Sequence, residues 1–267
     1  MITAGIDCGA KNTKAVILKD GEVIGKAMVL TGSDPVEAVR AAFDTAAQAA
    51  GIQRSEVESV AGTGSGRNAV KAADQRVDDI RAMGKGAFFR FPGARTVVDV
   101  GAEEARAGRL DDQGNAEDFA VNEKCAAGAG VFIETMSRAL ETPLEELGPL
   151  ALASDQSIPM NAQCAVFAES EVVGLIHAGA EKKDISRAIH DAMADRIATM
   201  IRRVGVNRDL VMIGGVARNP AVVEALKREL RLETIHVPDD PEYTAAVGAA
   251  VVAAGEMGKV SGGRGDA

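Results

Sequence analysis

The chain has 267 residues, of which 46% are hydrophobic and 26% are charged, and its formal net charge is -9 at pH 7. This acidic balance argues against nucleic acid or an anionic membrane surface as the main partner. No apolar stretch approaches the roughly 20 residues that a membrane-spanning helix needs, and the N-terminus lacks a signal-peptide pattern, so we expect a cytoplasmic protein. A chain of this length can bury a substantial core, as one large domain or two closely joined lobes.

The N-terminal segment combines a predicted strand with a candidate phosphate loop. An apolar run from Ile2 to Ile6 is followed by DCGAKNTKA, and a hairpin signal at residues 20–21 separates two further predicted strands. A glycine lets backbone N–H groups approach a phosphate, a hydroxyl or an amine can bind it, and an aspartate can hold hydrated Mg²⁺. Alone, the pattern Asp-x-Gly is weak, and an ordinary hairpin is its commoner meaning. The residues of interest here are Asp7, Gly9, Asn12, Thr13 and Lys14.

The same plan recurs from Thr96. An apolar strand again ends in an aspartate and a glycine, Asp99 and Gly101, before a second strand, a turn and a third strand. The distance from the aspartate to the glycine of the turn is 14 residues in the first copy and 15 in the second. Such an internal repeat predicts two related lobes, each offering an acidic residue and a backbone loop to one nucleotide cleft.

The segment between the copies predicts a helix and a glycine-rich loop. The helix begins at Pro35 and stops at Gly51. Residues 57–68 are typical of a strand that opens into a loop, which lacks the GK[ST] ending of a P-loop. The loop either lines the cleft or is a plain flexible turn, and a segment around Pro92 connects the lobes. The glycines of the loop are Gly62, Gly64 and Gly66.

The C-terminal part predicts a long helix, a nucleoside-binding turn and a helix of small residues. A helix from about residue 184 places large apolar side chains on one face, and its His190 is expected on the helix surface. A strand then opens into a glycine pair, Gly214 and Gly215, which lets a flat base or ribose approach the backbone. Residues 232–237 are expected to form a last strand. The apolar helix positions are Ile185, Ile189, Met193, Ile197 and Ile201.

Three cysteines make a disulfide framework improbable in a chain with no sign of export. Cys8 ends an apolar strand and is interpreted as a small core residue. Cys125 and Cys164 each stand immediately before an amphipathic helical run, and helix N-termini stabilise thiolates and anionic clusters. An iron–sulfur cluster usually needs about four cysteines, so two chains would each have to supply a pair. The alternative is two buried thiols at helix starts.

Taken together, these motifs resemble the actin, sugar kinase and Hsp70 superfamily of ATPases. DCGAKNTKA is similar to its first phosphate loop, VDVGAEE to its second, MIGGVARNP to its adenosine loop and YTAAVGAAVVA to its C-terminal connecting helix. The resemblance implies an α/β, duplicated ribonuclease H-like fold with two lobes around a nucleotide cleft. The implied division is a first lobe at 1–92, rejoined by helix 241–257, a second lobe at 93–240, and a disordered tail at 258–267.

Within that superfamily, NEKCAAGAG and CAVFAESEV resemble the cysteine signatures of a family of iron–sulfur ATPases. The family comprises activators of 2-hydroxyacyl-CoA dehydratases and the ATP-binding subunits of benzoyl-CoA reductase. The resemblance covers about residues 2–253 and implies one [4Fe-4S] cluster shared across a dimer, with Cys125 and Cys164 as this chain's ligands. The implied partners are a second homologous ATPase subunit or a second copy, ferredoxin, and iron–sulfur subunits that bind the substrate.

The resemblance also implies roles at the nucleotide site, with ATP and Mg²⁺ as cofactors. Asp7 and Asp99 would hold hydrated metal. The family usually has GGQDSK after its second Asp-x-Gly stem, whereas this chain has GAEEAR, so Glu103 or Glu104 is the candidate for positioning water. The implied nucleotide-binding residues are Gly9, Asn12, Thr13, Lys14, Gly101, Gly214, Gly215 and Arg218.

The GAEEAR segment resembles the shorter, D-type ATP-binding subunit of benzoyl-CoA reductase. The favoured function is therefore an ATP-hydrolysing electron-transfer subunit of a class I benzoyl-CoA reductase, which passes low-potential electrons from ferredoxin toward dearomatisation of benzoyl-CoA. One alternative is a homodimeric activator of a 2-hydroxyacyl-CoA dehydratase. A second alternative is a sugar kinase-like protein without a cluster.

Overall fold

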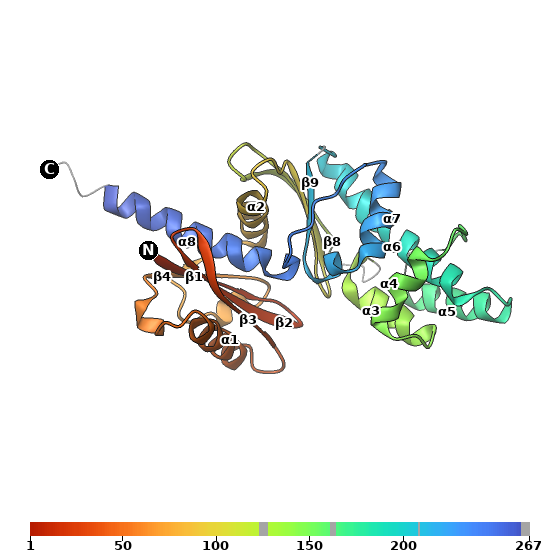
Figure 1. The fold of residues 1–267 in the computed structure, drawn as a ribbon, viewed down its shortest axis with the longest axis horizontal. Coiled ribbons are helices and arrows are strands. Elements are labelled where there is room, and N and C mark those ends of the chain that lie inside the picture. Colours follow the sequence, from red (N-terminus) through yellow and green to blue (C-terminus); the bar gives the residue numbers. More distant parts are fainter. Residues whose placement is uncertain (123–127, 161–163, 208, 263–267) are drawn as a thin grey trace. The chain divides into compact units, whose positions relative to one another are not determined.

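The structure is a computed structural model that describes residues 1–122, 128–160, 164–207 and 209–262. Its contacts divide the chain into two compact units, which are drawn in Figure 1. Unit 1 comprises Met1–Ala94, Leu110–Ala116 and the segment that starts at Glu242. Unit 2 comprises Arg95–Arg109 and Glu117–Pro241.

Unit 1 is built on a five-stranded sheet with the order β3-β2-β1-β4-β5. Strands β1, β2 and β3 form an antiparallel meander, and β4 runs parallel to β1. Asp20 and Gly21 both have positive φ, as expected for a tight two-residue hairpin turn between β2 and β3. The strands are β1 (Ile2–Cys8), β2 (Asn12–Lys19), β3 (Glu22–Leu30), β4 (Ser59–Thr63) and β5 (Gln75–Arg76).

Helices cover both faces of this sheet. On one face, Ile6 and Ile17 share a buried cluster with Val39 of α1 (Pro35–Ala49), whereas Val16 on the other face packs with α8 (Thr244–Gly262). A sheet buried on both faces explains why β1 and β2 are almost continuously apolar. Helix α1 starts where the sequence predicts, because the Asp34 carboxylate accepts hydrogen bonds from the first backbone N–H groups. Shorter elements are η1 (Arg54–Glu56), η2 (Arg67–Ala69) and η5 (Pro241–Tyr243).

Helix α8, which the sequence predicted as a helix of small residues, also packs closely against α2 (Asp79–Arg90). A Cβ atom added at Gly248 would overlap the carbonyl oxygen of Ala82 in α2. A Cβ atom added at Gly5 of β1 would overlap the carbonyl oxygen of Ala246 in α8. Backbone atoms cannot move aside as a side chain can, so these positions require glycine.

Unit 2 repeats the strand plan of unit 1 in a four-stranded sheet with the order β8-β7-β6-β9. Strand β6 is antiparallel to β7 and parallel to β9, as β1 is to β2 and β4. The internal repeat predicted from the two Asp-x-Gly segments is therefore present in the fold. The strands are β6 (Thr96–Val100), β7 (Ala105–Leu110), β8 (Ala116–Asn122) and β9 (Leu210–Ile213).

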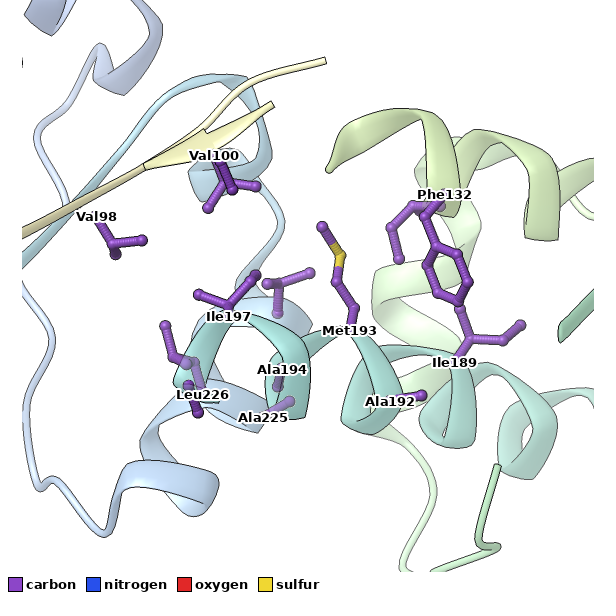
Figure 2. Packing of buried hydrophobic residues seen from close by; sticks show 14 of the residues in the cluster. Val98, Val100, Phe132, Ile189, Ala192, Met193, Ala194, Ile197, Ala225 and Leu226 are labelled. Atoms are coloured by element: carbon purple, nitrogen blue, oxygen red, sulfur yellow. The ribbon is translucent and has the colours of Figure 1, made fainter. Parts of the chain in front are cut away.

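The helices of unit 2 enclose its main core. Figure 2 shows Met193 and Ile197 of α6 in one packed cluster with Phe132 of α3, Val100 of β6 and Leu226 of α7. All five apolar positions that the helical spacing predicted in α6 are buried. The helices are α3 (Gly130–Ala139), α4 (Leu144–Leu152), α5 (Ala165–His177), α6 (Lys182–Val204) and α7 (Pro220–Leu230), and η4 (Gly215–Arg218) precedes α7.

Two expectations are wrong in unit 2. His190 is only 1% exposed, and hydrogen bonds to both ring nitrogens compensate its burial. Residues 232–237 form no strand, because only His236 reaches β9: its N–H donates to Leu210 and its carbonyl accepts from Met212.

The C-terminal part of the chain is helical further than the sequence suggested. Helix α8 extends to Gly262, whereas the predicted tail begins at residue 258, and residues 263–267 lie outside the described residues. In the part of the chain that the structure describes, no helix is both long and apolar enough to span a bilayer.

Candidate functional site

The first candidate phosphate loop joins β1 to β2 and carries an ion pair. Asp7 lies opposite Lys14 in the strand register, and the Lys14 ammonium binds Asp7 Oδ2 at 3.0 Å. The two side chains are 12% and 16% exposed. Between them, the Gly9 N–H donates to the Asn12 carbonyl at 3.1 Å and closes a tight turn. The arrangement offers a cation to phosphate and a carboxylate to hydrated metal, from one face of two adjacent strands.

Thr13 does not share that face. Its register partner is Cys8, and strand alternation directs this pair to the opposite side of the sheet. The Thr13 hydroxyl is fully buried and shares a 3.0 Å hydrogen bond with Thr31, whose own hydroxyl donates to the Gly9 carbonyl at 2.8 Å. Contrary to the predicted phosphate contact, Thr13 supports the loop from within the core of unit 1.

Cys8 is a core residue, as expected. It is fully buried and belongs to the cluster that packs against α1. Burial raises the pKa of its thiol, because the surrounding apolar atoms disfavour a thiolate.

The second loop repeats the first with different charges. Asp99 stands at the corresponding position of β6, and the Gly101 N–H donates to the Glu104 carbonyl at 2.9 Å in the same tight turn. Arg106 occupies the register position that Lys14 has in unit 1, and its guanidinium forms an ion pair with the Glu104 carboxylate. Glu103 is exposed. Of the two acids considered for positioning water, Glu104 is thus already engaged by a cation.

Backbone hydrogen bonds join this second loop to the first turn of α3. The carbonyl of Gly101 accepts from the Gly130 N–H at 2.9 Å, and that of Ala102 accepts from the Val131 N–H at 2.8 Å. These are donors that a helix N-terminus cannot satisfy internally. A shift of the loop therefore acts directly on α3, which packs against α5.

The candidate nucleoside-binding turn follows β9. Gly214 has φ +86, and its N–H donates to the Pro241 carbonyl at 3.0 Å. A Cβ atom added at Gly215 would meet nothing within 4 Å, so its backbone is open to a flat ligand. The half-exposed Arg218 guanidinium binds Asp240 at 3.2 Å.

His190 fixes the end of this turn, a role that the sequence interpretation missed. Its Nδ1 lies 2.7 Å from the Ser186 carbonyl oxygen, and its Nε2 lies 3.0 Å from Asn219 Nδ2. Since a carbonyl accepts and an amide nitrogen donates, the ring is neutral with its proton on Nδ1. Asn219 Oδ1 in turn caps α7 by accepting from the Ala221 N–H at 3.0 Å.

The stability of the protein is expected to fall as the pH drops below about 6.5, because burial lowers the pKa of His190 from its ordinary value of 6.5. In this pH range the His190 ring is protonated in the unfolded chain but not in the folded chain. The free energy of unfolding can therefore fall by about 1.4 kcal/mol per pH unit between the two pKa values. Urea unfolding at pH 7.5 and 5.5 measures it. His190→Gln should flatten this dependence, whereas the exposed His177→Gln should not; equal slopes in all three proteins would contradict the prediction.

The candidate cluster ligands are divided between described and undescribed parts of the chain. Cys164 is half-buried and stands at the N-cap of α5, with extended backbone angles and no side-chain cap hydrogen bond. Cys125 lies outside the described residues. No group of three or more candidate metal ligands occurs within residues 1–122, 128–160, 164–207 and 209–262. The thiols that could meet a cluster are thus at most the pair Cys125 and Cys164, which fits a cluster only if two chains share it.

The same fold occurs in solved ATP-binding proteins. A ROK family glucokinase from Streptomyces griseus, in complex with glucose and AMPPNP, has a TM-score of 0.62 at 14% identity and is matched over 96% of this chain and 100% of its own. This likeness, together with the duplicated sheet and the aspartate loop in each copy, shows the duplicated α/β, ribonuclease H-like fold. This confirms the predicted fold class.

The chain belongs to the BadF/BadG/BcrA/BcrD ATPase family, which it matches over residues 4–253. It is 39% identical to the activator of lactoyl-CoA dehydratase from Anaerotignum propionicum, over 95% of this chain and 97% of that protein. It is 30% identical to a benzoyl-CoA reductase subunit from Thauera aromatica, over 94% of this chain and 92% of that protein. The family resemblance inferred from the motifs is confirmed.

Two solved structures, one of a dehydratase component and one of a dehydratase activator, are similar over nearly the whole chain. Component A of the (R)-2-hydroxyglutaryl-CoA dehydratase from Acidaminococcus fermentans has a TM-score of 0.92 at 33% identity, covering 97% of this chain and 99% of its own. The activator of the 2-hydroxyisocaproyl-CoA dehydratase from Clostridium difficile, with bound ADPNP, has a TM-score of 0.91 at 34% identity, covering 100% and 99%. The chain is accordingly an ATP-binding protein of this ATPase family.

Proposed function

We propose that this chain is an ATP-dependent activator of a 2-hydroxyacyl-CoA dehydratase and acts as a homodimer. The two activators named above are 39% and 34% identical to it, and the dehydratase component is 33% identical, against 30% for the benzoyl-CoA reductase protein. The GAEEAR segment favoured the reductase, but similarity along the whole chain is stronger evidence of function than the sequence of one loop. The proposed activator is the function that the sequence interpretation held as its first alternative.

The nucleotide roles follow from the two aspartate loops. Asp7 and Asp99 would hold hydrated Mg²⁺, and Lys14 would exchange its ion pair with Asp7 for a phosphate oxygen. Exposed Glu103 is the better candidate for positioning water, because Glu104 is paired with Arg106. The backbones of Gly9, Asn12 and Gly101 would face phosphate, while Gly214, Gly215 and Arg218 would surround the nucleoside.

Cys125 and Cys164 would hold half of a shared [4Fe-4S] cluster. Such a cluster, when bound, accepts and donates single electrons at low potential. The start of α5 suits this role, since its free N–H groups and dipole stabilise an anionic centre. Beside Cys164, Val166 and Phe167 are each 67% exposed, an apolar surface that a second copy meeting at the cluster would cover. Ferredoxin as donor and the dehydratase as acceptor complete the proposed set of partners.

The observation that carries the proposal is the pair of hydrogen bonds between the second aspartate loop and α3. The loop after Asp99 would contact the γ-phosphate and Mg²⁺. Its two hydrogen bonds connect it to α3, the helix that follows the Cys125 segment in the sequence. Helix α3 packs against α5, which begins after Cys164. Two nucleotide-dependent positions of the loop would give two positions of these helices, the kind of two-state element that coupling requires.

The test is anaerobic purification followed by activation assays. A brown, iron-containing homodimer that activates a 2-hydroxyacyl-CoA dehydratase only with ATP and a reductant is the expected result. A stable complex with a second ATPase chain that bears a GGQD segment, together with ATP-dependent reduction of benzoyl-CoA, would favour the reductase instead. A colourless protein that remains free of iron after reconstitution would contradict both and leave the sugar kinase-like alternative.

A further inference from the structure

The glycine-rich loop after β4 closes over the end of β1. Gly64 has φ +91, and a Cβ atom added there would lie 2.5 Å from both Asp7 Oδ1 and the Cys8 carbonyl oxygen. The loop is anchored in this position, because the Gly66 N–H donates to the same Cys8 carbonyl at 2.8 Å. Its backbone is therefore packed directly against the carboxylate of the first phosphate loop.

Unit 2 contains the same contact at the equivalent place. Gly214 has φ +86, and a Cβ atom added there would overlap Asp99 Oδ1 and the carbonyl group of Val100. The strands that lead to the two glycines correspond as well: Thr63 of β4 lies opposite Asp7, as Ile213 of β9 lies opposite Asp99. The internal repeat thus extends beyond the two hairpins to the glycine loops.

We propose that Gly64 is a positioning residue for the Asp7 carboxylate, and that the loop it begins is the unit 1 counterpart of the turn at Gly214. Lys14 restrains Oδ2 through the ion pair, and the Gly64 backbone bounds the space beside Oδ1. When Lys14 exchanges this ion pair for a phosphate oxygen, the Gly64 backbone still borders Oδ1 and keeps the carboxylate oriented toward a hydrated cation. Only glycine fits, because the position combines positive φ with no room for Cβ.

The inference rests on the proposed role of Asp7 in holding Mg²⁺ at the nucleotide. The inference adds the glycine-rich loop after β4 to the proposed site. The sequence allowed two interpretations of this loop, as a lining of the cleft or as an ordinary turn. Two hydrogen bonds, from the Gly66 N–H to Cys8 and from the Arg67 N–H to Gly64 at 3.1 Å, give the loop a defined conformation. A residue that orients a metal-holding carboxylate should affect the binding of the metal complex of a nucleotide and spare the metal-free nucleotide.

The experiment compares calorimetric binding of ADP with Mg²⁺ and of ADP with EDTA. Gly64→Ala is expected to weaken Mg²⁺–ADP binding about 10-fold to 100-fold, the usual range for a lost partner of a metal-holding group, and to leave metal-free ADP binding unchanged. Gly21→Ala is the matched control, since Gly21 has φ +86 but nothing within 4 Å of an added Cβ. It adds the same kind of backbone strain without touching Asp7. Equal binding by the Gly64 variant and wild type would overturn the inference.

A second variant decides the matter if Gly64→Ala does not fold. Gly66 has φ −89, so alanine there adds no backbone strain, but its Cβ would lie 2.5 Å from Cys8 Sγ and push the loop away. Gly66→Ala should weaken Mg²⁺–ADP binding, and Cys8→Ala in the same chain should restore it by removing the sulfur. Undiminished binding by Gly66→Ala would count against the role of the loop.

A double-mutant cycle separates this inference from the proposed function beneath it. If Gly64 acts through Asp7, Gly64→Ala should cause no further loss in an Asp7→Asn background, whereas independent effects would add. Additive losses would refute the positioning role alone. Unchanged Mg²⁺–ADP binding by Asp7→Asn would instead refute the assignment of Asp7 to the nucleotide site.

Discussion

Cys164→Ser is expected to remove iron binding from the protein almost completely. Each copy would lose one of its two cluster ligands, so a cluster shared by two copies would lose half of its set, and a serine hydroxyl is a poor replacement for a thiolate on iron. Cys164 is half-buried at the N-cap of α5 and makes no side-chain cap hydrogen bond, so serine should leave the helix intact. Iron content and colour after anaerobic reconstitution measure the effect, and binding of Mg²⁺–ADP should be unchanged.

The matched control is Cys8→Ala. Cys8 is fully buried in the core of unit 1, where its high thiol pKa disfavours the thiolate that iron would require. This variant should bind as much iron as the wild type. Normal iron content in Cys164→Ser, or a loss of iron in Cys8→Ala, would show that the ligand assignment is mistaken.

Gly248→Ala is expected to have the largest effect on folding, a loss of about 3 kcal/mol or more in the free energy of unfolding. The added methyl group would overlap the Ala82 carbonyl oxygen and lie 2.7 Å from the Gly86 nitrogen. Both atoms belong to the backbone of α2, so relief requires α8 and α2 to separate along a buried contact. Urea unfolding of unliganded protein measures the change.

Gly255→Ala provides the opposite expectation in the same helix. Gly255 is exposed, and a Cβ atom there would meet nothing within 4 Å. Alanine should therefore stabilise the protein by about 0.5–1 kcal/mol, the difference in helix propensity. If Gly248→Ala proved as harmless as Gly255→Ala, the tight contact between α8 and α2 would be refuted.

Local patterns predicted most of the elements that form the site. Local sequence specifies the apolar runs, the turn at Asp20 and Gly21, and the helix start at Asp34 and Pro35. These elements can therefore be predicted without knowledge of tertiary contacts. The repeat of Asp7 and Asp99 is equally local, since each copy is a hairpin closed within about 15 residues. The cysteine signatures added the family, which similarity along the chain then confirmed.

Errors arose where a residue's role depends on what packs against it. Thr13 lies in the phosphate-loop segment, but the pairing of β1 with β2 turns its hydroxyl inward to Thr31. His190 is polar on a helix, yet it stands three residues before Met193 and seven before Ile197, on the buried side. Its role is to bind the Asn219 side chain, and this role depends on a contact with a residue in a different element, which helix periodicity does not predict.

The sequence by itself determined the repeated hairpins, the two aspartates at their strand ends and the start of α5 beside Cys164, because strand, turn and helix signals act over a few residues. Only the tertiary structure decided which groups meet. Parallel pairing of β4 with β1, and of β9 with β6, brings Gly64 to Asp7 and Gly214 to Asp99. These contacts join residues that are more than 50 positions apart, and their existence depends on strand register and close packing, which no local pattern encodes.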